Sequence, residues 1–377
     1  MIVFTFVPMK KLDLNNSRLL TPTMLDVFLK ENDILDALIT IGSSVQGKPI
    51  YSYHEGNGPF KVLMWSQMHG NESTTTKAML DFWMYLKTPA ASDLLDQCTF
   101  VMIPQLNPDG SDAYTRFNAN EVDLNRDAIE LSQPESIVLR SVYDQFQPHY
   151  CFNLHGQRTV FTAGNTYTPA TISFLAPSAD QNQTVTAARE LAMGLIVFAN
   201  NKLQKSIPDA VGRYDDSFNI NCIGDYFTSL NTPTVLFEAG HFKDDYHRVI
   251  ARKHVLEAII AMCNTIASSS IADFNVNSYF EIPENYKNLR DIEIFNIKTS
   301  SEGNFKTSAN SVFYQFKELK KGADVVFIPE IELFDEGLKG LLKIDAQQHD
   351  ALKDIVLDPL NPDYENLTKT ISLLIYI

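Results

Sequence analysis

Continuous apolar runs alternate with segments of helical periodicity between about residues 20 and 270. The continuous runs, typical of strands buried on both faces of a sheet, lie at 61–67, 98–104, 150–155 and 232–238. Apolar residues at helical spacing predict helices at 23–39, 71–86, 134–146, 185–205 and 243–268. Residues 41–56 alternate around Gly and Pro and predict a hairpin. Buried strands that alternate with helices predict an α/β fold, with a mainly parallel sheet covered on both faces.

The pattern changes after Ser268, where SSSIADFNVNSY is typical of a linker. The remaining chain carries short β-like runs and few long helices. These runs are FEIP, IEIFNI, ADVVFIP, LKGLLKIDA and TISLLIYI. The sequence therefore predicts two domains, a larger α/β domain over 1–270 and a small β-rich domain over 279–377.

Composition excludes several classes of protein. Hydrophobic residues make up 45% of the 377 residues, which is enough for a full core and excludes a disordered chain. The net charge of −15 disfavours sequence-independent binding to nucleic acid or to anionic lipid, since both need a basic face. The sequence contains no apolar run of membrane-spanning length. We therefore expect neither nucleic acid nor a membrane among its partners, and the sequence does not predict the oligomeric state.

The N-terminus and the cysteines favour a cytoplasmic location. The first eight residues, MIVFTFVP, are apolar, but the basic residues follow them, whereas a secretory signal has the reverse order. Met9 is an alternative start of the chain, and no propeptide is predicted. The four cysteines lie far apart without a CxxC pair, so we expect buried free thiols rather than disulfides.

Polar side chains gather where the predicted strands end. Ligands of open α/β sheets bind outside the carboxyl ends of the strands, so these side chains are expected to converge. The segment MHGNES, with His69 and Glu72, follows the first strand, and His155 and Glu238 end two others. NPDG (107–110), Arg116 and VDLNRD (122–127) follow the strand at 98–104.

This set of residues suits a zinc hydrolase. Catalytic zinc takes three His or carboxylate ligands and a water molecule, and His69, Glu72 and His155 supply such a set. Glu238 is then available as the base for the bound water. Arginine matches a carboxylate or a developing oxyanion, and Arg116 and Arg126 fit these two tasks.

Each piece has a structural alternative when it is taken alone. His254 and Glu257 repeat the HxxE spacing inside a strongly helical segment, where the pair is expected to be only part of a helix face. Glu238 alone fits a buried carboxylate held by backbone amides, and Arg126 alone fits an ordinary salt bridge. NPDG in isolation is a turn. The joint occurrence of these residues at strand ends favours a site.

The order of these motifs resembles the zinc metallocarboxypeptidases of the M14 (funnelin) type. IGSSVQGKPI (41–50), HGNE, NPDG, DLNR, His155 and FEAG (237–240) follow one another as they do in that family. The resemblance covers over half of the chain. It implies a zinc-carboxypeptidase-like fold with a mixed sheet, and one Zn²⁺ per chain.

The resemblance also implies a role for each matching position. His69, Glu72 and His155 are similar to the zinc ligands, and Glu238 to the general base. Arg116 resembles the arginine that polarises the scissile carbonyl. Asn125 and Arg126 resemble the pair that binds the C-terminal carboxylate of the substrate. Tyr214 is assigned as the family's mobile tyrosine, with Tyr226 as the alternative.

Three functions follow, in order of preference. The first is a metallocarboxypeptidase that hydrolyses the C-terminal bond of a peptide. The second is a zinc-dependent deacylase of N-acyl amino acids, because the desuccinylase/aspartoacylase branch shares HGNE and DLNR and often carries a β-rich C-terminal domain. NPDG favours the peptidase. The third is a non-catalytic binding protein that kept the fold. The side-chain preference, expected to be set around Ile223 and Gly224 with Arg158 or Arg213 as neighbouring charges, is not readable from the sequence.

Overall fold

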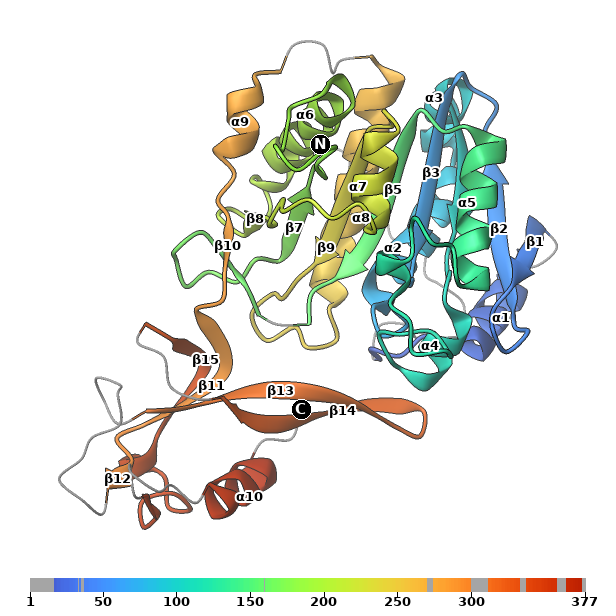
Figure 1. Cartoon of the computed structure of the whole chain (residues 1–377). Helices are drawn as coiled ribbons and strands as arrows, with labels where there is room; N and C mark the ends of the chain where they lie inside the picture. The colour runs from blue at the N-terminus through green and yellow to red at the C-terminus, as the bar shows by residue number, and fades with distance from the viewer. Residues whose placement is uncertain are drawn as a thin grey trace.

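A large sheet forms the centre of the computed structural model of the chain (Figure 1). The structure describes residues 17–32, 34, 37–158, 160–269, 274–299, 311–332, 337–357 and 364–374. The expectations about residues 1–16 lie outside this part. The large sheet has eight strands in the order β1-β2-β4-β3-β5-β9-β7-β8. They are β1 Leu38–Ser43, β2 Pro49–Glu55, β3 Phe60–Ser66, β4 Cys98–Ile103, β5 Tyr150–Gly156, β7 Ile172–Leu175, β8 Val211–Arg213 and β9 Thr234–Ala239.

The centre of this sheet is parallel and its flanks are mixed. β4, β3, β5 and β9 are parallel neighbours, and they are the four strands predicted from continuous apolar runs. β1, β2 and β4 pair antiparallel, as the predicted hairpin requires. β7, which was not predicted, pairs antiparallel with β9 and parallel with β8. The predicted fold class, a mixed and mainly parallel α/β sheet, is confirmed.

Helices cover both faces of the sheet, as Figure 1 shows. The helices of this part are α1 Pro22–Glu31, α2 Ser73–Leu86, α3 Ser92–Gln97, α4 Pro108–Ala113, α5 Pro134–Phe146, α6 Ala187–Leu203, α7 Ile223–Ser229, α8 Val249–Ala267 and α9 Val276–Phe280. α2, α6 and α8 bury their apolar faces in one core with Phe152 and Phe237 of the sheet. α5 and α7 cover the other face, where Trp65 and Phe227 pack edge to face.

Several predictions in this part are wrong. The helix predicted at 243–268 begins only at Val249. The helix predicted at 23–39 ends at Glu31, and Leu38 already begins β1, because its backbone pairs with that of Tyr53 in β2. NPDG is the start of helix α4 rather than a turn alone. The Asn107 side chain accepts a hydrogen bond from the backbone N–H of Gly110 at 2.8 Å and so caps the helix, with Pro108 at its first position.

A second, four-stranded sheet follows, in the order β14-β13-β11-β15. The remaining elements are β6 Thr162–Ala163, β10 Asn285–Tyr286, β11 Leu289–Phe295, β12 Lys298–Thr299, β13 Val312–Lys321, β14 Asp324–Glu332, β15 Lys339–Asp345, β16 Val356–Leu357 and α10 Glu365–Leu374. The second sheet has a hydrophobic core of its own, separate from the cores of the large sheet. This core includes Ile292 and Tyr314 of the sheet together with Leu367 and Ile371 of α10.

The C-terminal runs meet two corrections. TISLLIYI was predicted as β-like, but the run lies on helix α10 as far as Leu374. Leu367 and Ile371 are four residues apart and buried, so helical spacing decides the conformation over the β-propensity of the run. FEIP is not a strand either, since Phe280 ends α9. The β-like runs within β11, β14 and β15 are confirmed.

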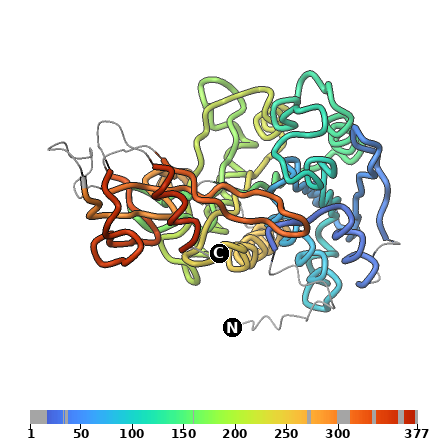
Figure 2. Tube along the Cα trace, turned by 90° about the horizontal axis from the view of Figure 1, so that it is seen from below, coloured from blue at the N-terminus to red at the C-terminus, as the bar shows by residue number. Residues whose placement is uncertain are grey.

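The second sheet contacts the larger part through β13. Seen from below, the β13–β14 hairpin crosses the side toward which β5 and β9 point (Figures 1 and 2). There the Glu318 carboxylate lies 2.9 Å from the Arg18 guanidinium and accepts a hydrogen bond from the Tyr114 hydroxyl at 2.5 Å. The division at 270/279 stays a prediction, and residues 270–273 of the predicted linker lie outside the described part. Among the described helices, none is long and apolar enough to span a membrane.

Candidate metal centre and cavity

The loop after β3 turns sharply and is held from below by the NPDG segment. Gln67 has a φ of 45°, a left-handed conformation that reverses the chain right after the strand. Gly70 lies directly against Gly110, since a Cβ at Gly70 would be 1.9 Å from the Gly110 carbonyl carbon. The Asn107 side chain donates to the Met68 carbonyl at 3.1 Å. NPDG therefore supports the loop that carries His69 and Glu72.

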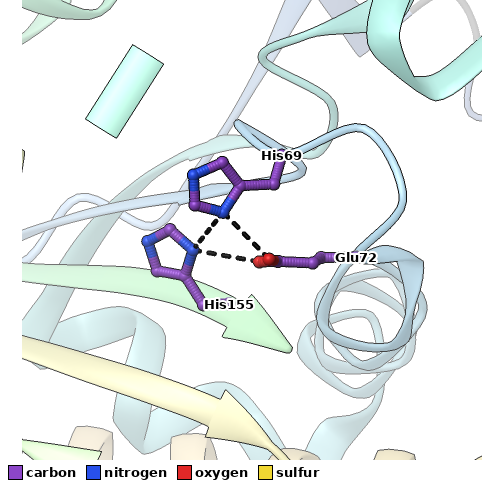
Figure 3. Close-up of side chains that lie close together, drawn as sticks. All are labelled: His69, Glu72 and His155. Carbon is purple, nitrogen blue, oxygen red and sulfur yellow. Dashed lines mark hydrogen bonds and ion pairs between the residues drawn. The ribbon is translucent and has the colours of Figure 1, made fainter. Parts of the chain in front are cut away.

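His69, Glu72 and His155 meet at the carboxyl end of the sheet, as the sequence predicted (Figure 3). His69 Nδ1 lies 2.9 Å from one Glu72 oxygen, and His155 Nδ1 lies 3.0 Å from the other. The two Nδ1 atoms are 3.1 Å apart. All three side chains are buried. Glu72 also accepts a hydrogen bond from the Gly156 backbone N–H at 3.0 Å, which fixes its carboxylate beside β5.

The three donor groups fit a zinc ion. They offer one ligand atom each within 4.8 Å of one another. With metal–ligand bonds of about 2.1 Å, a tetrahedral site separates its ligand atoms by about 3.4 Å. The observed separations of 2.9 to 3.1 Å are close to one face of such a tetrahedron. Two imidazoles and one carboxylate are also a ligand set of catalytic zinc, with a fourth position left for water.

The protonation of these groups follows from their burial and their contacts. Although burial opposes a charge on His69, the Glu72 carboxylate and the hydrogen bond that the imidazole donates to Asp123 raise the pKa of His69 above the ordinary value. Burial lowers the pKa of His155. Burial alone would raise the pKa of Glu72, but His69 and the hydrogen bond with His155 outweigh it and hold that pKa well below its usual range.

Asp123, the first residue of DLNR, supports the centre, a role that could not be predicted from the motif alone. His69 Nε2 lies 3.0 Å from Asp123 Oδ1, which orients the imidazole for its other nitrogen to bind a metal. Arg116 binds the second oxygen of Asp123 through Nε at 3.0 Å and Nη2 at 2.9 Å. Another Arg116 nitrogen lies 3.7 Å from Glu72, so the guanidinium borders the centre as predicted.

Glu238 lies next to His155 on the neighbouring parallel strand, where the two residues are register partners. Its half-buried carboxylate lines the cavity beside the centre. Burial and the nearby Glu72 carboxylate raise the pKa of Glu238 to about 8. A bound divalent cation would counteract this rise, since a positive charge favours the carboxylate form.

A cavity of about 460 Å³ opens beside the centre. Its lining includes seven of the eight residues singled out from the sequence; Glu72 is the exception. They are His69, Arg116, Asn125, Arg126, His155, Tyr214 and Glu238. The side-chain Oδ1 of Asn125 accepts a hydrogen bond from the Ile223 backbone N–H at 3.0 Å, which joins the DLNR segment to helix α7. Arg126 is exposed, and one of its nitrogens donates to Cys222 Sγ at 3.0 Å.

Of the two candidate tyrosines, the structure places Tyr214 in this cavity. Its ring packs against Phe161 with centroids 5.6 Å apart, and its backbone N–H donates to the Phe174 carbonyl. Burial and Glu238 both raise the pKa of Tyr214. Tyr226 is on α7, where its hydroxyl accepts a hydrogen bond from Arg140 at 2.6 Å, and it is absent from the described lining.

The remaining expectations concern groups outside the centre. His254 and Glu257 lie together on α8, with Nδ1 and Oε2 2.9 Å apart, and belong to a helix as predicted. All four cysteines are free thiols, and Cys222 is only half-buried. Neither Arg158 nor Arg213 appears among the described residues that line the cavity. Arg213 instead pairs with Glu284 at 2.6 Å.

Comparison with known proteins points to carboxypeptidases. The sequence model of the zinc carboxypeptidase family (Peptidase_M14) matches residues 23–195, just under half of the chain, and ends before Tyr214 and Glu238. The chain is 30% identical over 119 residues to a probable carboxypeptidase 2 of Arthroderma benhamiae, covering 30% of this chain and 22% of that protein. It is 29% identical over 152 residues to carboxypeptidase SOL1 of Arabidopsis thaliana, covering 34% and 30%. The match thus spans about a fifth of the fungal relative.

Solved structures share the fold. Carboxypeptidase A from Helicoverpa armigera aligns with a TM-score of 0.52 and 18% identity over 70% of this chain and 76% of that one. A metallo-carboxypeptidase from Pseudomonas aeruginosa, in complex with (2-guanidinoethylmercapto)succinic acid, aligns with a TM-score of 0.52 and 15% identity. That alignment covers 66% of this chain and 70% of the other.

Proposed function

We propose that this protein is a zinc metallocarboxypeptidase that removes the C-terminal residue of peptides. One observation carries the proposal: a His–Glu–His centre, a carboxylate and two arginines border a single cavity. The carboxypeptidase matches support the same activity.

The metal would be held by His69, Glu72 and His155, one ion per chain. A zinc ion in this position supplies a Lewis acid for the scissile carbonyl and lowers the pKa of a bound water to near neutrality. The chain contributes the geometry, because Asp123 and the Gly156 N–H fix His69 and Glu72 before any ligand arrives.

Glu238 is the proposed general base. It lines the cavity and is the register partner of His155 on the neighbouring strand. Its carboxylate takes a proton from the attacking water and then transfers it to the amine that leaves. Tyr214, in the same cavity, is proposed to close on the bound substrate.

The two arginines are proposed to bind two different negative charges, the developing oxyanion and the terminal carboxylate of the substrate. Arg116, which lies beside Glu72, would stabilise a developing oxyanion by charge and hydrogen bonds. Arg126 and Asn125 bind the terminal carboxylate, which places the last peptide bond over the centre. This requirement for a free carboxylate restricts cleavage to the C-terminal bond.

A deacylase of N-acyl amino acids is the second candidate. It would be favoured if residues 279–377 closed the cavity, but no described residue of that region is among those that line it. The matched proteins are carboxypeptidases and do not favour the deacylase. A non-catalytic protein is disfavoured because the complete set of polar groups borders one cavity.

Mass spectrometry tests the proposal directly. The zinc-loaded protein is incubated with a mixed pool of peptides and N-acyl amino acids, with the Glu238→Gln variant as the blank. We expect peptides shortened by one C-terminal residue. Cleavage confined to N-acyl amino acids would replace the proposal with the deacylase, and no cleavage of either class would favour the binding protein.

A further inference from the structure

A buried amide without a hydrogen-bond partner lies just below the cavity. Asn153 is 0% exposed on β5, and within the part of the chain that the structure describes neither its Oδ1 nor its Nδ2 has a partner. Trp65 is also 0% exposed, and its indole Nε1 is unpartnered in the same sense. Native proteins pair nearly all their buried polar groups, so these two side chains call for an explanation.

Their positions connect them to the cavity. Trp65 on β3 and Leu236 on β9 are the register partners of Asn153 on the two neighbouring strands. Leu236 and His155, which is two residues further along β5 on the same face, both line the cavity. Asn153 therefore lies one step below the cavity floor, between Trp65 and a lining residue.

Gly224 leaves the space opposite Asn153 free of a side chain. It lines the cavity from helix α7, and a Cβ added to it would lie 4.0 Å from Asn153 Nδ2. The same Cβ would be 2.9 Å from Pro177 Cγ, so any larger residue would crowd this part of the cavity. No side chain of Gly224 therefore stands between this part of the cavity and the Asn153 amide.

The charged residues around the cavity limit which kind of substrate side chain can bind near Asn153. Asp225 accepts hydrogen bonds from the Ser178 and Asn219 backbone N–H groups at 3.1 and 2.8 Å. Asp215, which also lines the cavity, accepts from the backbone N–H and the hydroxyl of Ser217 at 3.0 and 2.7 Å, so both carboxylates have partners within the protein. Arg116 and Arg126 already have tasks in the proposed reaction. Among the described lining residues, these two are the only cations apart from the histidines, which leaves none for an acidic side chain.

A carboxamide side chain of the substrate matches the unpartnered groups of Asn153 and Trp65. Its oxygen can accept from Asn153 Nδ2 or Trp65 Nε1, while its NH₂ can donate to Asn153 Oδ1. An aliphatic side chain would leave all of these atoms unpaired, which sites built for hydrogen bonding reject strongly.

We propose that Asn153 is the residue that sets side-chain preference, assisted by Trp65, and that the substrate ends in asparagine or glutamine. This assignment rests on the proposed carboxypeptidase activity and adds the class of residue released.

Paired peptides test the assignment on the zinc-loaded full chain. The peptides are identical except for the last residue, which is Asn or its near-isostere Leu, and Gln or its near-isostere Met. For the wild type we expect kcat/KM to favour at least one amide over its apolar partner by about tenfold or more, the scale of one hydrogen bond. Asn153→Leu should reverse the preference, with zinc content and thermal midpoint retained.

Two tryptophans provide a matched second test. Trp83 on α2 is also buried with an unpartnered Nε1 among the described residues, but it packs in the core on the other face of the sheet. Trp65→Phe should lower the amide preference several-fold, whereas Trp83→Phe should leave it unchanged. This pair tests the assignment even if Asn153→Leu does not fold.

The outcomes separate the two proposals. Hydrolysis by the wild type with equal or better use of Leu and Met would overturn the specificity assignment and leave the carboxypeptidase intact. An amide preference that survives in both Asn153→Leu and Trp65→Phe would also overturn it. Hydrolysis of none of the peptides would reject the carboxypeptidase and the assignment together.

Discussion

Glu72 is the residue on which the centre depends most directly. It is a buried carboxylate between two imidazoles, and one of its oxygens also accepts the Gly156 N–H. A buried charge is costly unless it is paired and hydrogen-bonded, and here each oxygen has a partner. The favourable contacts hold the pKa of Glu72 well below its usual range against the effect of burial. The carboxylate therefore remains ionised and available as a metal ligand.

Glu238→Gln separates catalysis from metal binding. The substitution keeps the size of the side chain but removes the group that accepts the proton from water. We expect kcat to fall by about a thousandfold or more, because a general base contributes about 10²–10⁴ to the rate. Zinc content, measured by elemental mass spectrometry, should stay at the wild-type level. Retained turnover would remove Glu238 from the mechanism.

Asp123→Asn tests the support of His69. The amide can still occupy the position 3.0 Å from His69 Nε2, but it carries no charge and presents a different hydrogen-bonding face. Second-sphere partners of this kind change metal affinity by about 10–100-fold when they are replaced. Competition with a chromophoric chelator should show weaker zinc binding by this factor. Unchanged affinity would mean that Asp123 serves only to hold Arg116.

The site residues differ in how visible they are in the sequence. His69 and Glu72 follow a continuous apolar run, and His155 and Glu238 end two others. All four could be predicted because parallel strands bring their carboxyl ends together. Asn153 could not, because it lies inside such a run and only the register with β3 and β9 shows what surrounds it.

Two HxxE pairs show how an element decides the meaning of a motif. His69 and Glu72 leave the sheet in a loop, so their side chains converge on His155. His254 and Glu257 stand on α8 at the same spacing and similar separation, 2.9 Å, but within the described chain they are not part of a three-residue metal group. His254 and Glu257 form only a local hydrogen bond on one face of the helix.

His254→Ala is therefore the control for the metal ligands. It removes one of the two HxxE histidines without touching the strand ends, so zinc content should equal that of the wild type. His69→Ala should lose most of the bound metal under the same dialysis. Because His254 is buried, a lower thermal midpoint is expected for its variant. Loss of zinc from His254→Ala would show that His254 and Glu257, and not His69 and Glu72, belong to the metal site.

Long, buried elements could be predicted from the sequence, whereas short ones could not. β3, β4, β5 and β9 were found because central parallel strands are apolar throughout. β8, Val211–Arg213, has three residues and lacks a readable period, so only its pairing with β7 defines it as a strand. The end of α10 was wrongly predicted as β-like because the run TISLLIYI is rich in β-branched residues. The residues of α10 that pack against the second sheet, Leu367 and Ile371, have helical spacing.

At the scale of the whole molecule, a buried ion pair joins the part of the chain that contains the eight-stranded sheet to the part that contains the second sheet. Arg18 and Glu318 have side chains that are each 6% exposed, with Tyr114 bonded to the same carboxylate. Glu318→Gln would leave the Arg18 cation buried without its counter-ion. Removing one partner of a buried pair costs about 3–5 kcal/mol, so a large fall in the free energy of unfolding is expected in chemical denaturation.

Glu330→Gln on the adjacent strand is the matched control for this prediction. Its partner, Lys317, is 2.9 Å away, but both side chains are about half exposed. Exposed pairs contribute about 0–1 kcal/mol, so this variant should unfold almost like the wild type. Equal effects of the two variants would show that burial of the Arg18 pair does not stabilise the contact.

A second link between the same regions makes stability depend on pH. Asp291 of β11 accepts hydrogen bonds from the Tyr246 hydroxyl at 3.0 Å and from the Phe316 N–H at 2.7 Å, and burial raises its pKa from 3.8 to about 6. Because the folded pKa is the higher one, the stabilisation is complete below pH 4 and is lost as the pH rises through 6. The wild type should therefore gain about 2 kcal/mol relative to Asp291→Asn between pH 7.5 and 4.5, measured by denaturant unfolding. A difference between the two proteins that stays constant over this range would place the pKa of Asp291 at its unfolded value.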